Sequence, residues 1–301
     1  MARPAVEGII DLMISFPSAR PEAKYHFMQP LLKDEDSRSR SMPAGFLFKD
    51  VPEGGPAAEQ PAEEFDPVDA LLAEMDKYGI AVGLIGVGPR TAGRALAEHP
   101  DRFAASLEID PNDIGGAVRS IRDAHREHGI KAVSTFPAGC NPQVPVSDRR
   151  YYPVYQTCVD LEIPIIVNAG IAGPRVPSAC QHVMHFDEVC YDFPDLVIVM
   201  RHGAEPWEEL AVKLMLKWPG LHYMTSAFAP KYYPKAVIDY ANTRGSDKVL
   251  YAGYYPMGLS LERIFRELED VPLREHVWPM FLRDNAARVF KIDVPSSPSG
   301  G

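Results

Sequence analysis

The chain has 301 residues, of which 46% are hydrophobic and 24% are charged, and its formal net charge is −10. This composition is typical of a globular protein that is long enough to bury a large core without disulfides or a structural metal. The acidic balance argues against binding along a nucleic-acid backbone, which needs clustered basic side chains. It excludes no small-molecule substrate, because a basic pocket can lie inside an acidic protein.

The four cysteines predict a reduced, cytoplasmic protein, because they form no CxxC pair and have no zinc-knuckle spacing. The N-terminal segment MARPAVEGIIDL does not have the pattern of a signal peptide, and no apolar run is long enough to span a membrane. The last eight residues, 294–301, are rich in Pro, Ser and Gly and are expected to be a disordered tail.

Apolar, β-branched runs alternate with amphipathic helical patterns along residues 1–293, which indicates an α/β fold with a parallel sheet. The expected strands are Val6–Met13, Gly79–Val87, Arg102–Ile109, Ile130–Phe136, Pro164–Ala169, Leu196–His202, Leu221–Phe228 and Lys248–Tyr255. Helices are expected at Pro67–Tyr78, Asp113–His128, Pro153–Leu161, Trp207–Trp218, Tyr233–Thr243 and within Leu259–Phe290. Eight such repeats favour a single (β/α)8 TIM barrel. An open doubly wound sheet is the alternative, but no GxGxxG turn follows the first strand.

Residues 18–64 form a long insertion between the first strand and its helix. Phe46, Leu47 and Phe48 need apolar surface to cover, so this part is predicted to lie over the barrel mouth as a lid. Residues 53–63 are predicted to be mobile, because EGGPAAEQPAE lacks apolar side chains larger than alanine and proline. An arm that contacts a second subunit is an equally good interpretation.

Five segments, spread from Ile9 to Phe290, are IIDLMISFP, LEIPIIVNAG, FPDLVIVMRHGAEPW, KVLYAGYYPMG and RDNAARVF. Together and in this order they resemble the amidohydrolase-related family, which includes aminocarboxymuconate-semialdehyde decarboxylase and aromatic-acid decarboxylases. The resemblance implies a TIM-barrel hydrolase or lyase that acts on a small molecule. Together with the long first loop, it also implies a homodimer.

The sequence departs from this family at the positions of its metal ligands. The family's first strand ends in Asp-x-His-x-His, whereas this chain has Met13 and Ser15 at the two histidine positions. Asn168 replaces the ligand histidine of the fifth strand, and Tyr254 replaces the aspartate of the eighth. A thioether, a hydroxyl, an amide and a phenol are poor ligands for zinc or manganese. We therefore expect no metal cofactor, and the alternative is a zinc or manganese ion bound by unusual ligands, namely Asp11, Glu108, Asp110 and His202.

His202 remains at the end of the sixth strand, where the resemblance places an acid/base group. An imidazole carries protons in both directions near neutral pH, and active sites of TIM barrels lie at the carboxyl ends of the strands. A structural histidine is the alternative. The predicted catalytic residues are His202, Tyr254, Asn168 and Glu205.

Other residues near the strand ends are expected to contact the substrate. Arg175, in a loop after the fifth strand, is predicted to bind a carboxylate, with a surface ion pair as the equal alternative. Arg201 is expected to face the helical layer, away from His202. The remaining predicted binding residues are Ser15, Met13, Asp11, Phe136, Tyr255 and Trp207.

These residues favour an enzyme that uses metal-independent acid–base chemistry on a small organic acid or ring compound. Decarboxylation, hydration and opening of an activated bond need only a proton carrier and hydrogen-bond donors. The alternatives are a ligand-binding barrel without catalysis, and a metal-dependent hydrolase or decarboxylase. The sequence determines neither the substrate nor the type of reaction.

Overall fold

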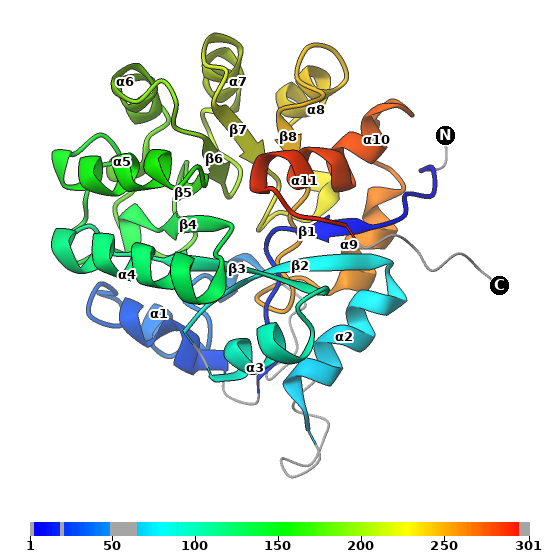
Figure 1. Ribbon diagram of the computed structural model, residues 1–301, viewed down its shortest axis with the longest axis horizontal. Coiled ribbons are helices and arrows are strands. Elements are labelled where there is room, and N and C mark those ends of the chain that lie inside the picture. Colours follow the sequence, from blue (N-terminus) through cyan, green and yellow to red (C-terminus); the bar gives the residue numbers. More distant parts are fainter. Residues whose placement is uncertain (1–2, 19–20, 49–64, 89, 295–301) are drawn as a thin grey trace.

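The computed structural model describes residues 3–18, 21–48, 65–88 and 90–294. Eight parallel strands follow one another around a curled sheet in the order β1 to β8, so the prediction of an α/β TIM-barrel fold is confirmed (Figure 1). The segment 53–63 and almost all of the predicted tail lie outside the described residues. The strands are β1 Ile9–Asp11, β2 Ile80–Gly86, β3 Phe103–Glu108, β4 Ala132–Thr135, β5 Ile165–Asn168, β6 Ile198–Arg201, β7 Leu221–Met224 and β8 Val249–Leu250.

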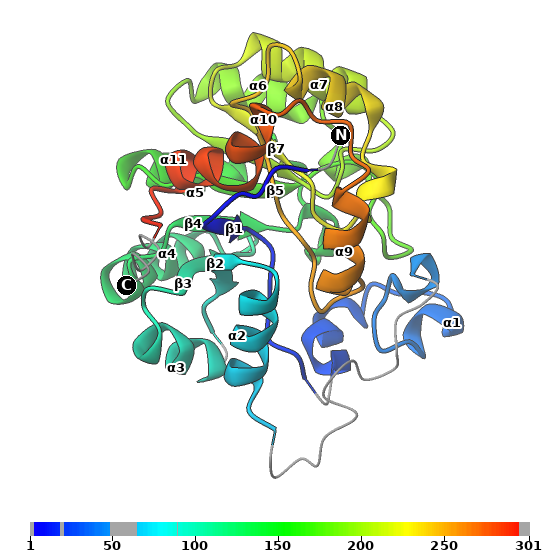
Figure 2. The same cartoon turned by 90° about the vertical axis from the view of Figure 1, so that its right-hand side faces the viewer.

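Helices surround the strands and connect each strand to the next (Figures 1 and 2). The α-helices are α1 Glu35–Arg38, α2 Pro67–Lys77, α3 Arg90–Glu98, α4 Ile114–His128, α5 Tyr152–Asp160, α6 His185–Asp192, α7 Glu208–Lys217, α8 Lys235–Ala241, α9 Leu261–Leu268, α10 Val277–Pro279 and α11 Asn285–Phe290. Local sequence fixes several ends: Asp66 caps the start of α2 through the backbone N–H groups of Val68 and Asp69, and Gly129 ends α4 in a left-handed conformation (φ 57°).

Alternation along the strands separates two apolar layers. Ile10, Val82, Ile166 and Val199 belong to a cluster that fills the barrel, together with Phe290 of α11. Their neighbours on the strands pack in a second, larger cluster with the surrounding helices. Side chains on both faces of each strand are therefore buried, which explains the nearly continuous apolar runs in the sequence.

The barrel closes between β1 and β8 through a few contacts at their carboxyl ends. A parallel bridge joins Ile14 to Tyr255, and the backbone N–H of Ser15 donates to the carbonyl of Tyr255 at 2.9 Å. The Asp11 carboxylate adds a side-chain link, because its Oδ1 accepts the backbone N–H groups of Met13 (2.9 Å) and Gly253 (2.8 Å). The two edge strands thus meet without a regular hydrogen-bonded ladder.

The described part of the insertion consists of short turns of helix. A 3-10 helix spans Pro21–Met28, α1 follows, and a second 3-10 helix spans Gly45–Leu47. Arg175, in the loop after β5, links to this segment: it forms ion pairs with Asp34 (2.7 Å) and Asp36 (3.0 Å). The insertion is therefore held against the carboxyl-terminal side of the barrel.

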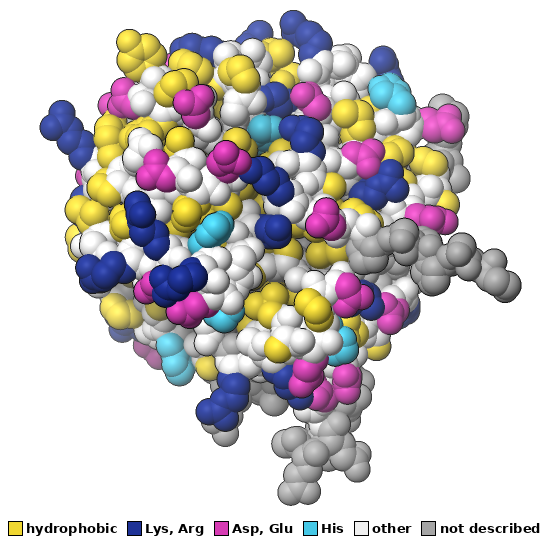
Figure 3. Space-filling model, viewed as in Figure 1, with side chains coloured by type: hydrophobic (Ala, Val, Ile, Leu, Met, Phe, Trp, Pro, Cys, Tyr) yellow, Lys and Arg dark blue, Asp and Glu magenta, His cyan; other side chains and the backbone are white. Residues whose placement is uncertain are grey.

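Basic and acidic side chains are interspersed on the face shown in Figure 3. Within the described ranges, no helix combines the length and the apolar character that a membrane crossing requires.

Candidate active site

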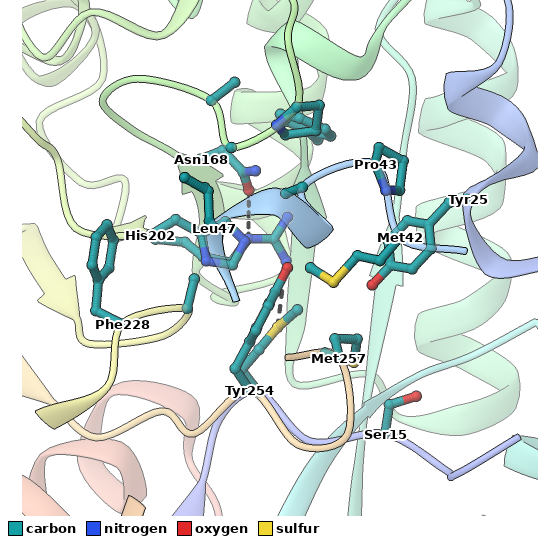
Figure 4. Close-up of a pocket in the computed structure, with 18 of the residues that line it drawn as sticks. Ser15, Tyr25, Met42, Pro43, Leu47, Asn168, His202, Phe228, Tyr254 and Met257 are labelled. Atoms are coloured by element: carbon teal, nitrogen blue, oxygen red, sulfur yellow. Dashed lines mark hydrogen bonds between the residues drawn. The ribbon is translucent and has the colours of Figure 1, made fainter. Parts of the chain in front are cut away.

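A cavity of about 1000 Å³ opens at the carboxyl ends of the strands. Strand ends form its floor, and the insertion contributes apolar side chains that include Met42, Phe46 and Phe48. Asn168, His202 and Tyr254 converge on this space in Figure 4, with Leu47 close by. The cavity therefore brings together most of the residues that the sequence singled out.

Arg201 lies inside the cavity, so the prediction that it faces the helical layer is wrong. Val199 points into the barrel, and the side chain two residues further along β6 points the same way. The Arg201 side chain is only 6% exposed, and its Nε donates to Asn168 Oδ1 at 2.5 Å. Its Nη1 lies 3.9 Å from the sulfur of Met13, and both contacts are drawn as dashed lines in Figure 4.

Glu108, the last residue of β3, is the carboxylate nearest to this guanidinium among the described residues. Its Oε2 lies 3.7 Å from Arg201 Nη2, which is too long for a hydrogen bond, and its side chain is 54% exposed. The carboxylate therefore offsets only part of the positive charge of Arg201.

His202 reaches the same cavity although it directly follows Arg201. Its backbone lies in the left-handed region (φ 70°), which interrupts the alternation of the strand. Its Nδ1 shares a hydrogen bond of 2.9 Å with the hydroxyl of the buried Ser226, beyond the end of β7. Burial, with the Arg201 charge as the second cause, holds the pKa of His202 well below its ordinary value. His202 is thus a neutral imidazole at pH 7.

Tyr254 forms one wall of the cavity between His202 and the insertion. Its ring meets that of His202 edge-on at 5.3 Å and stacks on that of Phe48 at 6.1 Å. Burial raises the pKa of Tyr254 to about 12, although the charge of Arg201 acts in the opposite direction. The phenol is therefore protonated at neutral pH and can donate a hydrogen bond.

Ser15, Met13 and Phe136 also line the cavity, as does Lys24 from the insertion. The ammonium group of Lys24 donates to Ser15 Oγ at 3.1 Å and to the carbonyl of Phe16 at 2.7 Å. Met13 offers only its thioether sulfur, which contacts Arg201. The first strand thus contributes a hydroxyl and an apolar group to the cavity.

Three predicted binding residues do not line the cavity. Asp11 is fully buried and is bound to the backbone of Met13 and Gly253, because it faces the outer layer like Ile9. Tyr255 is 3% exposed and provides the backbone bridge to the first strand. Trp207 packs against the ring of His182 at 4.0 Å. These positions correct the prediction that they contact the substrate.

Glu205 and Arg175 also line the cavity. Ser226, rather than Glu205, is the partner of the His202 ring. Burial and the nearby Glu208 raise the pKa of Glu205. Arg175 is bound to Asp34 and Asp36 and lies 4.6 Å above the Phe46 ring, which corresponds to its alternative interpretation as an ion pair.

The sequence analysis assigned no role in the site to Arg201 or Ser226, and considered Glu108 only as a ligand of an unusual metal site. A signal for Arg201 and Glu108 was available, because both follow small or apolar interior residues at a spacing of two. Ser226 has a weaker signal, a Thr-Ser pair directly after an apolar strand. The alternation of β6 places Arg201, two residues after the interior Val199, on the inner face, and His202 reaches the cavity only through its left-handed backbone.

Comparisons with known proteins agree with this fold. A family model described as amidohydrolase matches residues 90–292. No curated protein sequence matches the chain. An uncharacterized TIM-barrel protein from Bordetella bronchiseptica has 24% identity and a TM-score of 0.72, with 94% of this chain and 98% of that one covered.

Two further structures have the same fold. The 5-carboxyvanillate decarboxylase from Novosphingobium aromaticivorans has 16% identity and a TM-score of 0.65, and the match covers 95% of this chain and 96% of that one. The 4-oxalomesaconate hydratase from Rhodopseudomonas palustris has 16% identity and a TM-score of 0.60, with 94% and 95% covered. The decarboxylase structure contains manganese and 4-hydroxy-3-methoxy-5-nitrobenzoic acid.

The bound manganese contradicts the prediction of no metal cofactor and supports the alternative of a divalent metal. The residues at the expected ligand positions do not fit such an ion. Met13 offers a thioether, the Asn168 oxygen is already bound to Arg201, and a guanidinium in contact with both would repel a second cation. Across the described part of the chain, no three His, Cys, Asp or Glu side chains are grouped so that they can hold a metal. A metal here would need other donors.

Proposed function

Because the chain belongs to the amidohydrolase family, and is therefore a hydrolase or lyase, we propose that it is a lyase that decarboxylates a small ring acid. Proton transfer through His202 is the step that we assign to this chain's own residues. The proposal extends to this protein the type of reaction named for the 5-carboxyvanillate decarboxylase structure.

The observation that carries the proposal is a neutral imidazole fixed at the floor of the cavity. Ser226 holds Nδ1 of His202 at 2.9 Å, which leaves Nε2 to exchange a proton with a bound molecule. The Tyr254 phenol and the Arg201 guanidinium supply hydrogen-bond donors and positive charge within the same cavity. Proton-transfer catalysis requires a proton carrier next to such hydrogen-bond donors, and the cavity contains both.

Decarboxylation requires one proton to replace one carboxyl group. The bond between the ring and the carboxyl carbon breaks, its electron pair stays on the ring carbon, and carbon dioxide leaves. His202, after taking up a proton from solvent, delivers it to that carbon, so that the carboxylate and one proton become the ring C–H and carbon dioxide. Donors around the ring stabilise the negative charge that develops on it. Addition of water across a double bond, as in the hydratase relative, would use the same proton carrier.

The lining of the cavity supports a ring-shaped substrate. Apolar and aromatic side chains cover most of its wall, and about 1000 Å³ is ample for a substituted benzoate. Phe48 stacks on Tyr254, so a side chain of the insertion forms part of the wall. We therefore propose that the insertion 18–64 serves as a lid, and that a homodimer contact is its alternative role.

A second candidate is a metal-dependent version of this reaction, favoured by the manganese in the decarboxylase structure. Metal analysis of the purified protein distinguishes the two. About one equivalent of manganese, with activity lost on chelation and restored by the metal, would support the second candidate.

Replacement of His202 tests the proposed function. His202→Asn should lower kcat by at least about 10²-fold, because general acid–base groups typically contribute that much. The assay is release of carbon dioxide from a panel of hydroxylated benzoates, and unfolding curves check that the fold is intact. His185→Asn is the matched control, since His185 is bound to Ser147 and the carbonyl of Ala179 outside the cavity. Full turnover by His202→Asn would remove this residue from the mechanism.

A further inference from the structure

Arg201 is a buried cation whose nearest carboxylate among the described residues, that of Glu108, is more than half exposed and only partly offsets its charge. Its side chain is 6% exposed, and its only hydrogen bond to oxygen goes to the neutral amide of Asn168. The Nη1 group contacts the Met13 sulfur at 3.9 Å, and Nη2 lies 3.7 Å from a half-exposed carboxylate. A buried charge is unfavourable unless it is paired and hydrogen-bonded. The two Nη groups therefore have unused capacity to bind an anion.

The other arginines that line the cavity are neutralised by the protein itself. Arg175 has two aspartates at 2.7 and 3.0 Å, and Nε of Arg263 lies 2.9 Å from Glu267. Both are more exposed than Arg201, at 44% and 25% of their side chains. The contrast separates Arg201 from arginines that have a structural role.

We propose that the Nη groups of Arg201 bind the carboxylate of the substrate, with Asn168 holding the guanidinium in place through Nε. This inference rests on the function proposed above and deepens it, because it identifies the group that recognises the acid. A guanidinium binds a carboxylate in a planar, two-pronged geometry. The carboxyl group would then lie next to His202 and Tyr254, which border the same space (Figure 4).

The surroundings of Arg201 add a second argument. Its guanidinium contacts Met13 and Asn168 and interacts electrostatically with Tyr254. These three residues occupy the positions at which the resemblance expects metal ligands. The arginine thus supplies fixed positive charge at the point where these three strand ends meet, and none of the three side chains neutralises it.

Equilibrium binding of benzoate and benzamide, measured by calorimetry, tests the proposal. Benzoate should bind the wild-type protein at least about tenfold more tightly than benzamide, because a hydrogen bond to a charged group is the stronger one. Arg201→Gln should abolish this preference: its affinity for benzoate should fall at least about tenfold, whereas its affinity for benzamide should change little. Arg201→Lys should give an intermediate affinity for benzoate, since an ammonium group cannot form the two-pronged contact.

Arg263→Gln is the matched control, because it removes an arginine of the cavity that already has a carboxylate partner. It should keep the preference for benzoate. Equal affinities of wild-type protein for benzoate and benzamide would overturn the proposal without any variant. The same holds if benzoate binds only after manganese is added and binds Arg201→Gln equally well, because a metal would then hold the carboxylate.

Failure of this proposal and failure of the proposed function are distinguishable. If Arg201 binds benzoate but no acid is turned over, the carboxylate site stands and the lyase does not. If turnover depends on His202 while benzoate binding is indifferent to Arg201, the lyase stands and the carboxylate site is elsewhere.

Discussion

At the end of β6, the consecutive residues Arg201 and His202 both reach the cavity. Arg201 carries a permanent positive charge, whereas the charge of His202 depends on its protonation. Arg201 follows the alternation of the strand, whereas His202 reaches the cavity through a left-handed backbone conformation. The charge of Arg201 opposes protonation of His202 and adds to the effect of burial. A bound carboxylate that offsets this charge would therefore make His202 easier to protonate when substrate is present.

This coupling predicts a shift in the titration of His202. In the free protein its ring should stay neutral until the pH falls well below 6.5, the ordinary value for histidine. Saturating benzoate should raise the pKa, because the carboxylate removes the repulsion between the guanidinium and the imidazolium. Arg201→Gln should raise it without benzoate. NMR of histidine-labelled protein, assigned with His202→Asn, measures these values, and a pKa that is unchanged by both would contradict the coupling.

The residues of the site could be predicted from sequence where a resemblance fixed their position on a strand. Met13, Ser15, Asn168 and Tyr254 were recognised because they replace residues of a known motif, and all four line the cavity. Arg201 was not, since a run such as IVMRH is apolar on both faces and does not show which face points inward. Ser226 depends on the placement of a different strand end, which sequence spacing alone does not give.

Among the strands, β1 and β8 depend most on side-chain contacts for their pairing. Both were predicted as eight-residue strands, but the regular strands cover only Ile9–Asp11 and Val249–Leu250. The reason is that the two edges meet through one bridge and the Asp11 carboxylate instead of a ladder. Asp11 Oδ2 and the Tyr251 hydroxyl face each other, and neither has a further partner among the described residues.

Burial raises the pKa of Asp11 to about 6. Between about pH 4 and 6 the unfolded chain loses this proton while the folded protein retains it, so Asp11 makes the fold less stable as the pH rises. Asp11→Asn keeps an oxygen acceptor for both backbone N–H groups and removes the titration. Its free energy of unfolding, relative to wild type, should increase by about 1 kcal/mol from pH 5 to pH 7.

Urea unfolding at the two pH values measures this change. Asp11→Ala, the control, loses the acceptor and should be less stable than Asp11→Asn at both. If the difference in free energy of unfolding between Asp11→Asn and wild type does not change with pH, burial does not raise the pKa of Asp11.

At the scale of the whole molecule, the repeating pattern of strands and helices was sufficient to predict the barrel. Each strand candidate contains the strand that the structure shows, because strands buried on both faces have apolar runs that stand out from amphipathic helices. The cavity could not be derived in this way, since its wall joins strand ends to an insertion of irregular sequence. Contacts such as Phe48 with Tyr254 and Asp34 with Arg175 bridge more than 100 residues and have no periodic signal.

The most direct test of the account is a crystal structure of the protein with benzoate, grown in the presence of manganese. The carboxylate oxygens should lie about 3 Å from the Nη atoms of Arg201, with Nε still bound to Asn168 and the ring beside Tyr254. An ion bound between Met13, Asn168 and Tyr254, with the carboxylate on that ion and Arg201 displaced, would contradict it.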